Sequence, residues 1–349
     1  MAGVVSLPSS RGSSFVTDGS QGGWRIVTPR AEISATAVDE NRWHISLRSL
    51  VGSRVPRSSC ETTFPRELVE QLLDTTSPEW LCDAIARHED PAYIRNEVRT
   101  QLFAYFPPSA YAGRRLLDFG CGNGASTMAI AQLLPETEVV GVELEARRVS
   151  EANAILAHRR LPNARFMRSP SGEQLPADIG SFDFVMLSAV FEHLLPTERS
   201  SVMPLLWSHM RPGAVMFVNQ TPHRWHPYEH HSTHLWGINY LPDALAWRLA
   251  NRYGTGTQGR TWPDMLRGGI RGGTERSMRM ALTGGNLQAA EVLQPTQNGL
   301  RDRADHWLSC TSSRQRTLKR LIATLFRLSD RLFGTVLTLN VSVAIRKRD

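Results

Sequence analysis

Five of the eleven histidines of this 349-residue chain lie in one short segment, Thr221–His234 (TPHRWHPYEHHSTH). A neutral imidazole is well suited to accept a proton near neutral pH. Glu229 and His231 are two residues apart, so they would face the same side of an extended loop, where the carboxylate could orient the ring. We predict that His231 is a general base oriented by Glu229, with His193 of the pair Glu192-His193 as a second candidate. The alternative is that these groups only hold a loop in place by hydrogen bonds.

The same segment offers possible metal ligands in His230, His231, His234 and Glu229. Adjacent histidines, however, seldom direct both rings at one ion. The cysteines are scattered and form no C-x-x-C pair, so neither a zinc site nor a disulfide framework is indicated; they are Cys60, Cys82, Cys121 and Cys310. We therefore predict no metal, and the cysteine pattern fits a reducing cytoplasm.

The most specific motif is a glycine-rich turn, LLDFGCGNG, at Leu116–Gly124. Its three glycines allow a tight turn whose backbone can closely approach a ligand. Glu143 follows 19 residues after Gly124, where an acidic side chain can accept both hydroxyls of a ribose. Asp118, two residues before the first glycine, would repel a pyrophosphate but attract an ammonium and a sulfonium group. We therefore predict that the cofactor is S-adenosylmethionine rather than NAD.

Alternating strands and helices must position these groups. Short apolar runs predict strands at 115–119, 138–142, 164–168, 182–187 and 214–218. Helix-length segments separate most of them, at 124–134, 145–160 and 197–210. A last pair, 289–294 and 335–346, could complete the sheet. The pattern predicts an α/β fold with a doubly wound, mostly parallel seven-stranded sheet, whose carboxyl edge carries the glycine turn and the histidine segment.

LLDFGCGNG, followed by VVGVE and SFDFVMLSAVFEHL, resembles the class I S-adenosylmethionine-dependent methyltransferases, especially the type 11-like small-molecule group, over about residues 110–220. The resemblance implies a Rossmann-like fold with S-adenosylmethionine as cofactor. Where this group usually has G-D-A-E-x-L-P, the chain has PSGEQLP, so an adenine contact at Ser171 would use its hydroxyl or a backbone carbonyl. By resemblance, the cofactor contacts are Asp118, Phe119, Gly120, Cys121, Gly122, Gly124, Glu143, Leu144, Ser171, Gly172, Glu173 and Ser188.

The histidine segment is similar to a bacterial methyltransferase pattern, T-P-N-R-x-x-P-x-E-x-H-T, with His223 in place of the Asn. Quinone-type O-methyltransferases carry a metal-binding acid three residues before the glutamate of the Glu-His pair. Ala189 stands there, so the resemblance implies no metal. The implied reaction is methyl transfer to a hydroxyl of a small molecule, such as a glycan, a lipid-linked compound or a secondary metabolite. The alternatives are an NAD-dependent oxidoreductase and a non-catalytic binding module for S-adenosylmethionine.

Three units are predicted along the chain. Residues 1–23, rich in Ser and Gly, form a disordered tail. Residues 24–106 form a β-hairpin, from alternation in 31–38 and 42–48, and a helical cap. Residues 107–349 form the methyltransferase domain with an insertion at 221–285. Within it, the Gly- and Arg-rich stretch 253–276 is a flexible insertion, with a substrate lid or an RNA-binding sequence as alternatives.

The net charge of +7 lies entirely in residues 301–349, which hold 11 basic and 4 acidic residues, while the rest is balanced at 29 against 29. This distribution of charge argues against a nucleic-acid-binding surface on the main body. It favours a local contact between the basic C-terminal segment and an anionic partner. Segment 314–333 predicts an amphipathic helix that packs on the domain core, with docking on a membrane surface as the alternative. There is no run of 18 apolar residues and no secretory signal, so we expect a cytoplasmic protein, with membrane association if that helix docks.

Overall fold

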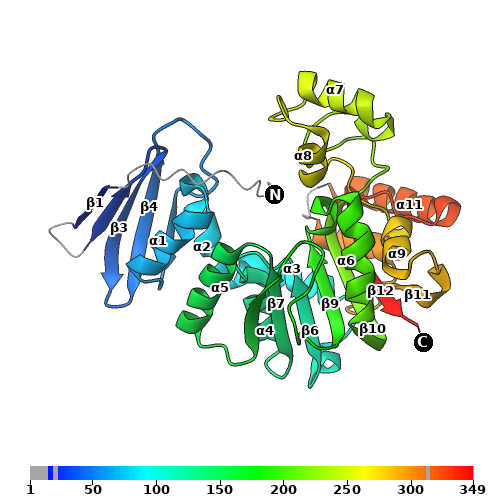
Figure 1. The fold of residues 1–349 in the computed structure, drawn as a ribbon, viewed down its shortest axis with the longest axis horizontal. Coiled ribbons are helices and arrows are strands. Elements are labelled where there is room, and N and C mark those ends of the chain that lie inside the picture. Colours follow the sequence, from blue (N-terminus) through cyan, green and yellow to red (C-terminus); the bar gives the residue numbers. More distant parts are fainter. Residues whose placement is uncertain (1–14, 19–22, 312–314, 349) are drawn as a thin grey trace.

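The computed structural model describes residues 15–18, 23–311 and 315–348. Its main sheet has seven strands in the order β11-β12-β10-β9-β6-β7-β8, all parallel except β12, which runs antiparallel to both neighbours (Figure 1). The fold class and every predicted strand of this sheet are confirmed. The strands are β6 (Arg115–Phe119), β7 (Glu138–Glu143), β8 (Ala164–Arg168), β9 (Phe182–Ser188), β10 (Met210–Pro222), β11 (Ala290–Leu293) and β12 (Asn340–Lys347).

Consecutive residues of the central strands bury their side chains on opposite faces of the sheet, because side chains alternate along a strand. Leu116 and Phe184 join one apolar cluster with helices α3 (Pro91–Leu102) and α4 (Ala125–Leu133). Leu117 and Val185 join another with α6 (Pro196–Ser208) and α9 (Glu275–Thr283). Both faces are therefore covered, as the near-continuous apolar runs of these strands require.

The N-terminal part is a five-stranded antiparallel sheet ordered β1 to β5 along the chain. The predicted hairpin is confirmed as β3 (Ala31–Asp39) paired with β4 (Arg42–Ser49). Three four-residue strands were not predicted, namely β1 (Phe15–Asp18), β2 (Trp24–Val27) and β5 (Ser59–Thr62). Most of the predicted disordered tail lies outside the described residues, but Phe15–Asp18 pair with β2, so the prediction is wrong for these four.

Helices α1 (Arg66–Thr75) and α2 (Leu81–Glu89) join the N-terminal sheet to the main domain. One continuous apolar core holds Leu72 of α1 and Ile85 of α2 together with Ile155 of α5 (Ala146–Arg159) and Phe166 of β8. The third helix of the predicted cap, α3, instead packs on the main sheet. By its packing, the main domain therefore begins before the predicted boundary at residue 107.

The insertion between β10 and α9 contains α7 (Asp243–Tyr253) and α8 (Trp262–Arg267) and lies above the sheet in Figure 1. Its own small core consists of Ile238, Ala246, Ala250, Met265 and Ile270. The buried Arg271 guanidinium donates to the carbonyl oxygens of Ile238 and Asn239 and to Asp243. The stretch 253–276 is therefore an ordered, packed segment, and the prediction of a flexible insertion is wrong.

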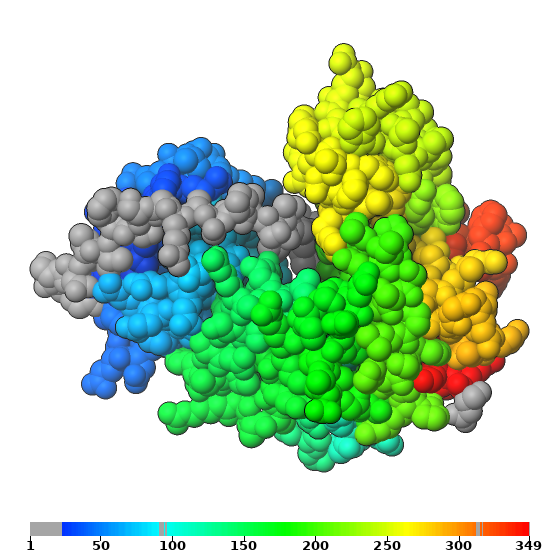
Figure 2. Space-filling model, viewed as in Figure 1, coloured from blue at the N-terminus to red at the C-terminus, as the bar shows by residue number. Residues whose placement is uncertain are grey.

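Two helices precede β12, α10 (Arg303–Cys310) and α11 (Arg316–Phe333). Helix α11 lies at the end of the molecule opposite the N-terminal sheet (Figure 1). No helix among the described residues combines the length and the apolar character needed to cross a bilayer. Between the N-terminal sheet and the insertion, the surface is hollowed above the main sheet (Figure 2).

Candidate functional site

The glycine turn joins the end of β6 to the start of α4. Gly120, Gly122 and Gly124 all have positive φ, at 74°, 58° and 83°, which favours glycine. A Cβ on Gly120 would lie 2.6 Å from Val190 Cγ2, and one on Gly124 would lie 2.4 Å from Phe166 Cζ. Packing inside the protein therefore already requires glycine at these two positions.

Gly122 is different, because a Cβ there would meet only Arg148 Nη1, at 3.6 Å. Its amide donates to Glu143 Oε2 at 2.9 Å, so the turn and the end of β7 are joined as predicted. Glu143 Oε1 also accepts from the amides of Leu144 and Glu145, at 2.8 and 3.1 Å. This fixes the Glu143 carboxylate beside the one glycine of the turn that faces open space.

Asp118 lies at the end of β6, and its carboxylate is buried. The Thr127 hydroxyl donates to Asp118 Oδ2 at 2.6 Å. Burial raises the pKa of Asp118 to about 6, and the nearby Glu143 carboxylate adds to this. Two negative charges therefore flank the turn, and this arrangement suits a ligand that carries positive charge.

The remaining predicted cofactor residues lie at the carboxyl ends of the same four adjacent strands, β9, β6, β7 and β8. Ser188 ends β9, Phe119 ends β6 and is buried, and Leu144 is exposed after β7. After β8, the Ser171 hydroxyl accepts from the Glu173 amide at 3.3 Å, which shapes the turn around Gly172. The structure thus brings the predicted cofactor residues to one edge. Cys121 packs beside Gly141, and its burial raises the pKa of the thiol, so it is a packing group and not a nucleophile.

The N-terminal sheet and helices also reach the glycine turn, through Glu151 of α5. Glu151 is buried and accepts from Asn123 Nδ2 at 3.0 Å and from the Thr75 hydroxyl of α1. Burial raises its pKa to about 7. Glu151 therefore connects α1 of the N-terminal part to the turn, a link between distant segments that no local sequence pattern indicates.

The predicted pairing of Glu229 with the His231 ring is wrong. The buried Glu229 carboxylate accepts from the backbone amides of His231, Ser232 and Thr233 and from the hydroxyls of Ser232 and Thr233. These contacts use both of its oxygens. Glu229 therefore holds the turn that carries His231, which is the structural alternative that the sequence left open.

The carboxylate that lies close to the His231 and His193 rings is that of Glu192, in the short helix η3 (Phe191–His193). One side-chain atom from each of Glu192, His193 and His231 lies within 4.8 Å of the other two. The two rings have centroids 5.3 Å apart, and His193 Nε2 is 3.9 Å from Glu192 Oε1. Both candidate bases therefore belong to one cluster, which we call the Glu192–His193–His231 cluster.

Polar atoms in this cluster lack partners inside the protein. Glu192 Oε1 and His231 Nε2 are buried and accept or donate no hydrogen bond among the described residues. Burial raises the pKa of Glu192 to about 7 and lowers that of His231 to about 4, and it also lowers the pKa of His193. Both rings are therefore neutral near pH 7, and an unprotonated ring nitrogen can accept a proton or bind a cation.

Groups from three other elements hold the cluster in place. The Thr221 hydroxyl at the end of β10 donates to Glu192 Oε2 at 3.0 Å, and His193 Nδ1 lies 2.7 Å from the Arg267 carbonyl oxygen. The latter contact makes Nδ1 the protonated nitrogen of His193 and leaves Nε2 as an acceptor. A Cβ on Gly269 would lie 3.0 Å from His231 Nε2, so the Arg267–Gly269 segment closes over the cluster. Thr221, Arg267 and Gly269 were not predicted in this role. The one sequence signal for Arg267 and Gly269 is the clustering of Gly and Arg at 253–276.

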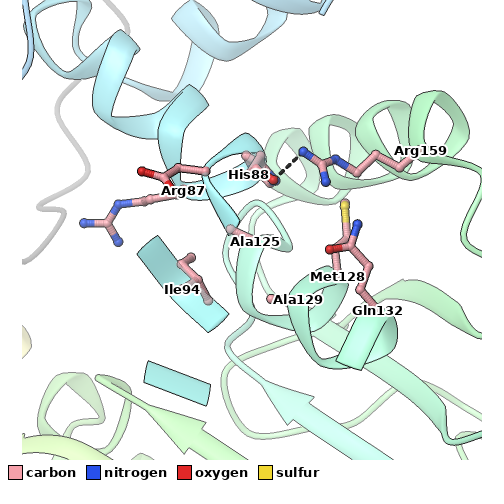
Figure 3. Close-up of a pocket in the computed structure, with 9 residues that line it drawn as sticks. Arg87, His88, Ile94, Ala125, Met128, Ala129, Gln132 and Arg159 are labelled. Atoms are coloured by element: carbon pink, nitrogen blue, oxygen red, sulfur yellow. Dashed lines mark hydrogen bonds between the residues drawn. The ribbon is translucent and has the colours of Figure 1, made fainter. Parts of the chain in front are cut away.

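A separate small pocket lies where α2 meets α4 and α5 (Figure 3). Arg159 donates to the His88 carbonyl oxygen there. The His88 ring is fully desolvated, which lowers its pKa to about 3 and keeps it neutral. The residues lining this pocket include none of the predicted cofactor or catalytic residues.

Residues 116–213 match the family model of a methyltransferase domain. The trans-aconitate 2-methyltransferase of Deinococcus radiodurans is 32% identical over 124 residues, which is 36% of this chain and 43% of that protein. The malonyl-[acyl-carrier protein] O-methyltransferase of Legionella pneumophila is 29% identical over 111 residues, covering 31% and 38%. The solved structure of PKMT2 from Rickettsia typhi in complex with AdoHcy aligns with a TM-score of 0.43 and 13% identity, over 76% of this chain and 54% of that one.

With the sheet order and the glycine turn, the family match identifies a class I S-adenosylmethionine-dependent methyltransferase domain in this chain. Its cofactor is S-adenosylmethionine, as predicted, so the alternative of an NAD-dependent enzyme is set aside. The chain spans about half or less of the length of the curated relatives that it matches.

Proposed function

We propose that this protein transfers the methyl group of S-adenosylmethionine to an oxygen of a small-molecule acceptor. The observation that carries the proposal is the convergence of three features at the carboxyl edge of one sheet: the open Gly122, the two carboxylates of Asp118 and Glu143, and the Glu192–His193–His231 cluster. Bound there, S-adenosylmethionine supplies a methyl group activated on a positively charged sulfur.

The residues of the turn fit this cofactor. Asp118 places a buried negative charge where an ammonium or sulfonium group gains from it. The Glu143 carboxylate, held by three amides, keeps lone pairs with which it can accept hydrogen bonds from ribose hydroxyls. Gly122 leaves its backbone open to close approach.

The Glu192–His193–His231 cluster follows a residue that packs on this turn. Val190 packs on Gly120, and Glu192 follows two residues later. An acceptor oxygen placed between the turn and the cluster could attack the methyl carbon while the carbon–sulfur bond breaks and its electron pair stays on sulfur. Positioning of the reactants is the main contribution of a protein to such a displacement. The cluster would accept the proton that the hydroxyl loses.

The proposal that the methyl group is transferred to an oxygen is more specific than methyl transfer as such. Its support is the neutral imidazole nitrogens of the cluster, which can promote loss of the proton from a hydroxyl. The name of one matched relative, a trans-aconitate 2-methyltransferase, favours a small acceptor, and the name of another, a malonyl-[acyl-carrier protein] O-methyltransferase, favours an oxygen as the methylated atom. We also propose a cytoplasmic location, since all four cysteines are free thiols.

The proposal predicts that isothermal titration calorimetry will detect S-adenosylhomocysteine binding and no NADH binding. A screen of hydroxylated metabolites with labelled S-adenosylmethionine should then yield a methylated product. Gly122→Arg should abolish both signals, because the new side chain would enter the open space beside the turn. Gly213→Arg is a matched control, since Gly213 also has a positive φ of 75° and open surroundings but lies at the start of β10. Binding of NADH alone would contradict the proposal.

A further inference from the structure

We propose that the Glu192–His193–His231 cluster is a divalent-metal site, and that the cation, rather than a free imidazole, prepares the acceptor for methylation. This inference rests on the proposed function for its catalytic role, but not for the site itself. The sequence predicted no metal because adjacent histidines such as His230 and His231 seldom direct both rings at one ion. The structure assembles a different set from η3 and the loop after β10.

The ligand atoms have the chemistry and spacing that a cation needs. Two imidazole nitrogens and one carboxylate oxygen form a set that first-row divalent ions bind. The atoms lie within 4.8 Å of one another, so small side-chain rotations would bring all three to one ion.

Two observations beyond proximity point to a ligand. Glu192 is fully buried, yet its Oε1 has no hydrogen-bond partner in the described part of the chain, and neither has the buried Nε2 of His231. Buried polar atoms are almost always hydrogen-bonded or bound to a ligand, so a bound group that engages both atoms is expected. A cation would satisfy both atoms together.

Neighbouring groups orient the side chains of His193 and Glu192. Metal-binding histidines usually direct their second nitrogen at a carbonyl or carboxylate, and His193 Nδ1 meets the Arg267 carbonyl oxygen at 2.7 Å. The second oxygen of Glu192 accepts from Thr221 at 3.0 Å, which orients Oε1 toward the rings. These contacts present His193 Nε2 and Glu192 Oε1 to the same space.

A cation here also suits the reaction. It would lower the pKa of an acceptor hydroxyl, so that the proton can leave to solvent and the oxygen can bond to the methyl carbon. An acceptor with two neighbouring oxygens, such as a vicinal diol or a hydroxy acid, could bind the ion through both. We therefore infer that acceptors of this class are preferred.

The test is titration of untagged, EDTA-treated protein with Co²⁺, followed by visible absorption. One equivalent should bind and give ligand-field bands, and Glu192→Gln and His231→Ala should each weaken binding at least about tenfold. His230→Ala is the matched control, because His230 neighbours His231 in sequence but lies outside the cluster, and it should bind Co²⁺ as the wild type does. Calorimetry with S-adenosylhomocysteine checks that the variants remain folded and keep the cofactor site.

Absence of stoichiometric Co²⁺ binding would overturn the metal proposal, as would loss of binding in His230→Ala with retention in Glu192→Gln. Full methyl transfer by EDTA-treated protein, lost in His231→Ala, would instead assign His231 as the general base. Failure of the metal proposal can be distinguished from failure of the proposed function, because Co²⁺ binding tests the cluster even if no S-adenosylhomocysteine binds.

A second inference rests on a different feature, the outer face of α11. The sequence favoured packing of its apolar face on the core, but in the structure that face is exposed, with Leu321 59%, Leu332 64% and Phe333 72% exposed. The inner face instead holds Trp307 against Phe326 and Arg327 against Asp302. The exposed apolar row consists of Leu318, Leu321, Leu325, Leu328, Leu332 and Phe333.

We infer that this row docks on an anionic membrane surface. At about 100° per residue, Arg320 and Arg331 lie on one flank of the row, and both are exposed. Asp330, the one acidic residue of α11, is bonded to Arg303. Two copies packed through this face would bring arginines together with no acidic partner on it, whereas anionic lipid headgroups complement them.

Co-sedimentation with vesicles tests this surface. The full chain should bind vesicles of phosphatidylglycerol and phosphatidylcholine (1:3) several-fold better than pure phosphatidylcholine vesicles. The double variant Leu325→Glu/Leu328→Glu should abolish binding, and Arg320→Gln/Arg331→Gln should reduce it and its salt dependence. Leu245→Glu, at an exposed leucine of α7, is the control and should bind normally. A salt-insensitive dimer that Leu325→Glu/Leu328→Glu disrupts, without vesicle binding, would overturn the inference.

Discussion

Asp118→Asn is expected to raise the stability of the protein while weakening cofactor binding. Burial raises the pKa of Asp118 to about 6, from an ordinary value of 3.8, so the ionised carboxylate is less favourable in the folded state than in the unfolded chain. A shift of this size corresponds to about 3 kcal/mol of lost folding free energy at pH 7. An uncharged amide can still accept from Thr127, so we expect a gain of about 1–3 kcal/mol.

The contribution of Asp118 to the free energy of unfolding depends on pH with a defined sign. The folded state binds more protons than the unfolded state between about pH 4 and pH 6, so the contribution of Asp118 to stability falls as pH rises through this window. The stability difference between Asp118→Asn and wild type should be near zero at pH 4 and reach its full value by pH 7. Urea unfolding at several pH values measures it.

Cofactor binding should change in the opposite direction. Loss of the carboxylate removes an interaction with a charged group, which we expect to weaken S-adenosylhomocysteine binding by about 10- to 100-fold, and S-adenosylmethionine binding further because of its sulfonium charge. Asp183→Asn is the control, because Asp183 is paired with Arg114 and Arg211, which hold its pKa low, so its loss should destabilise the fold and leave cofactor binding unchanged. Unchanged S-adenosylhomocysteine affinity in Asp118→Asn would contradict the cofactor role.

The main sheet could be predicted because its strands are short, apolar runs buried on both faces, and this pattern is local to each strand. The N-terminal sheet is different, since β2 and β5 have four residues each and owe their conformation to pairing with β3 and β4. Four residues are too few to display a period, so tertiary contacts determine these strands.

The Glu192–His193–His231 cluster shows the same limit at the level of side chains. Sequence proximity suggested Glu229 as the partner of His231, but a carboxylate two residues away in a tight turn bonds the backbone amides instead. Glu192, about forty residues earlier, reaches the ring because the ends of β9 and β10 are neighbours in the sheet. His193 and His231 were predicted as site residues, but Glu192 was not, because its place beside them depends on the topology.

Two alanine substitutions in the glycine turn are expected to have opposite consequences for fold and function. In Gly124→Ala, the Cβ would lie 2.4 Å from the Phe166 ring and 3.2 Å from Ala152, at a φ of 83°. Neither neighbour can move freely within the apolar core, so overpacking and backbone strain should destabilise the protein by about 2–4 kcal/mol. Urea or thermal unfolding should report this loss directly.

Gly122→Ala should leave most of the stability intact. Its Cβ would meet only the flexible Arg148 guanidinium, so the expected cost is the backbone strain of a φ of 58°, about 1 kcal/mol. The methyl group would nevertheless stand in the open space where the backbone approaches the cofactor, and calorimetry should show at least about tenfold weaker S-adenosylhomocysteine binding. Gly213→Ala carries similar strain far from the turn and should bind normally. If Gly122→Ala bound S-adenosylhomocysteine as well as Gly213→Ala does, the cofactor would have to lie elsewhere, because Gly122 is the only glycine of the turn whose Cβ position is open.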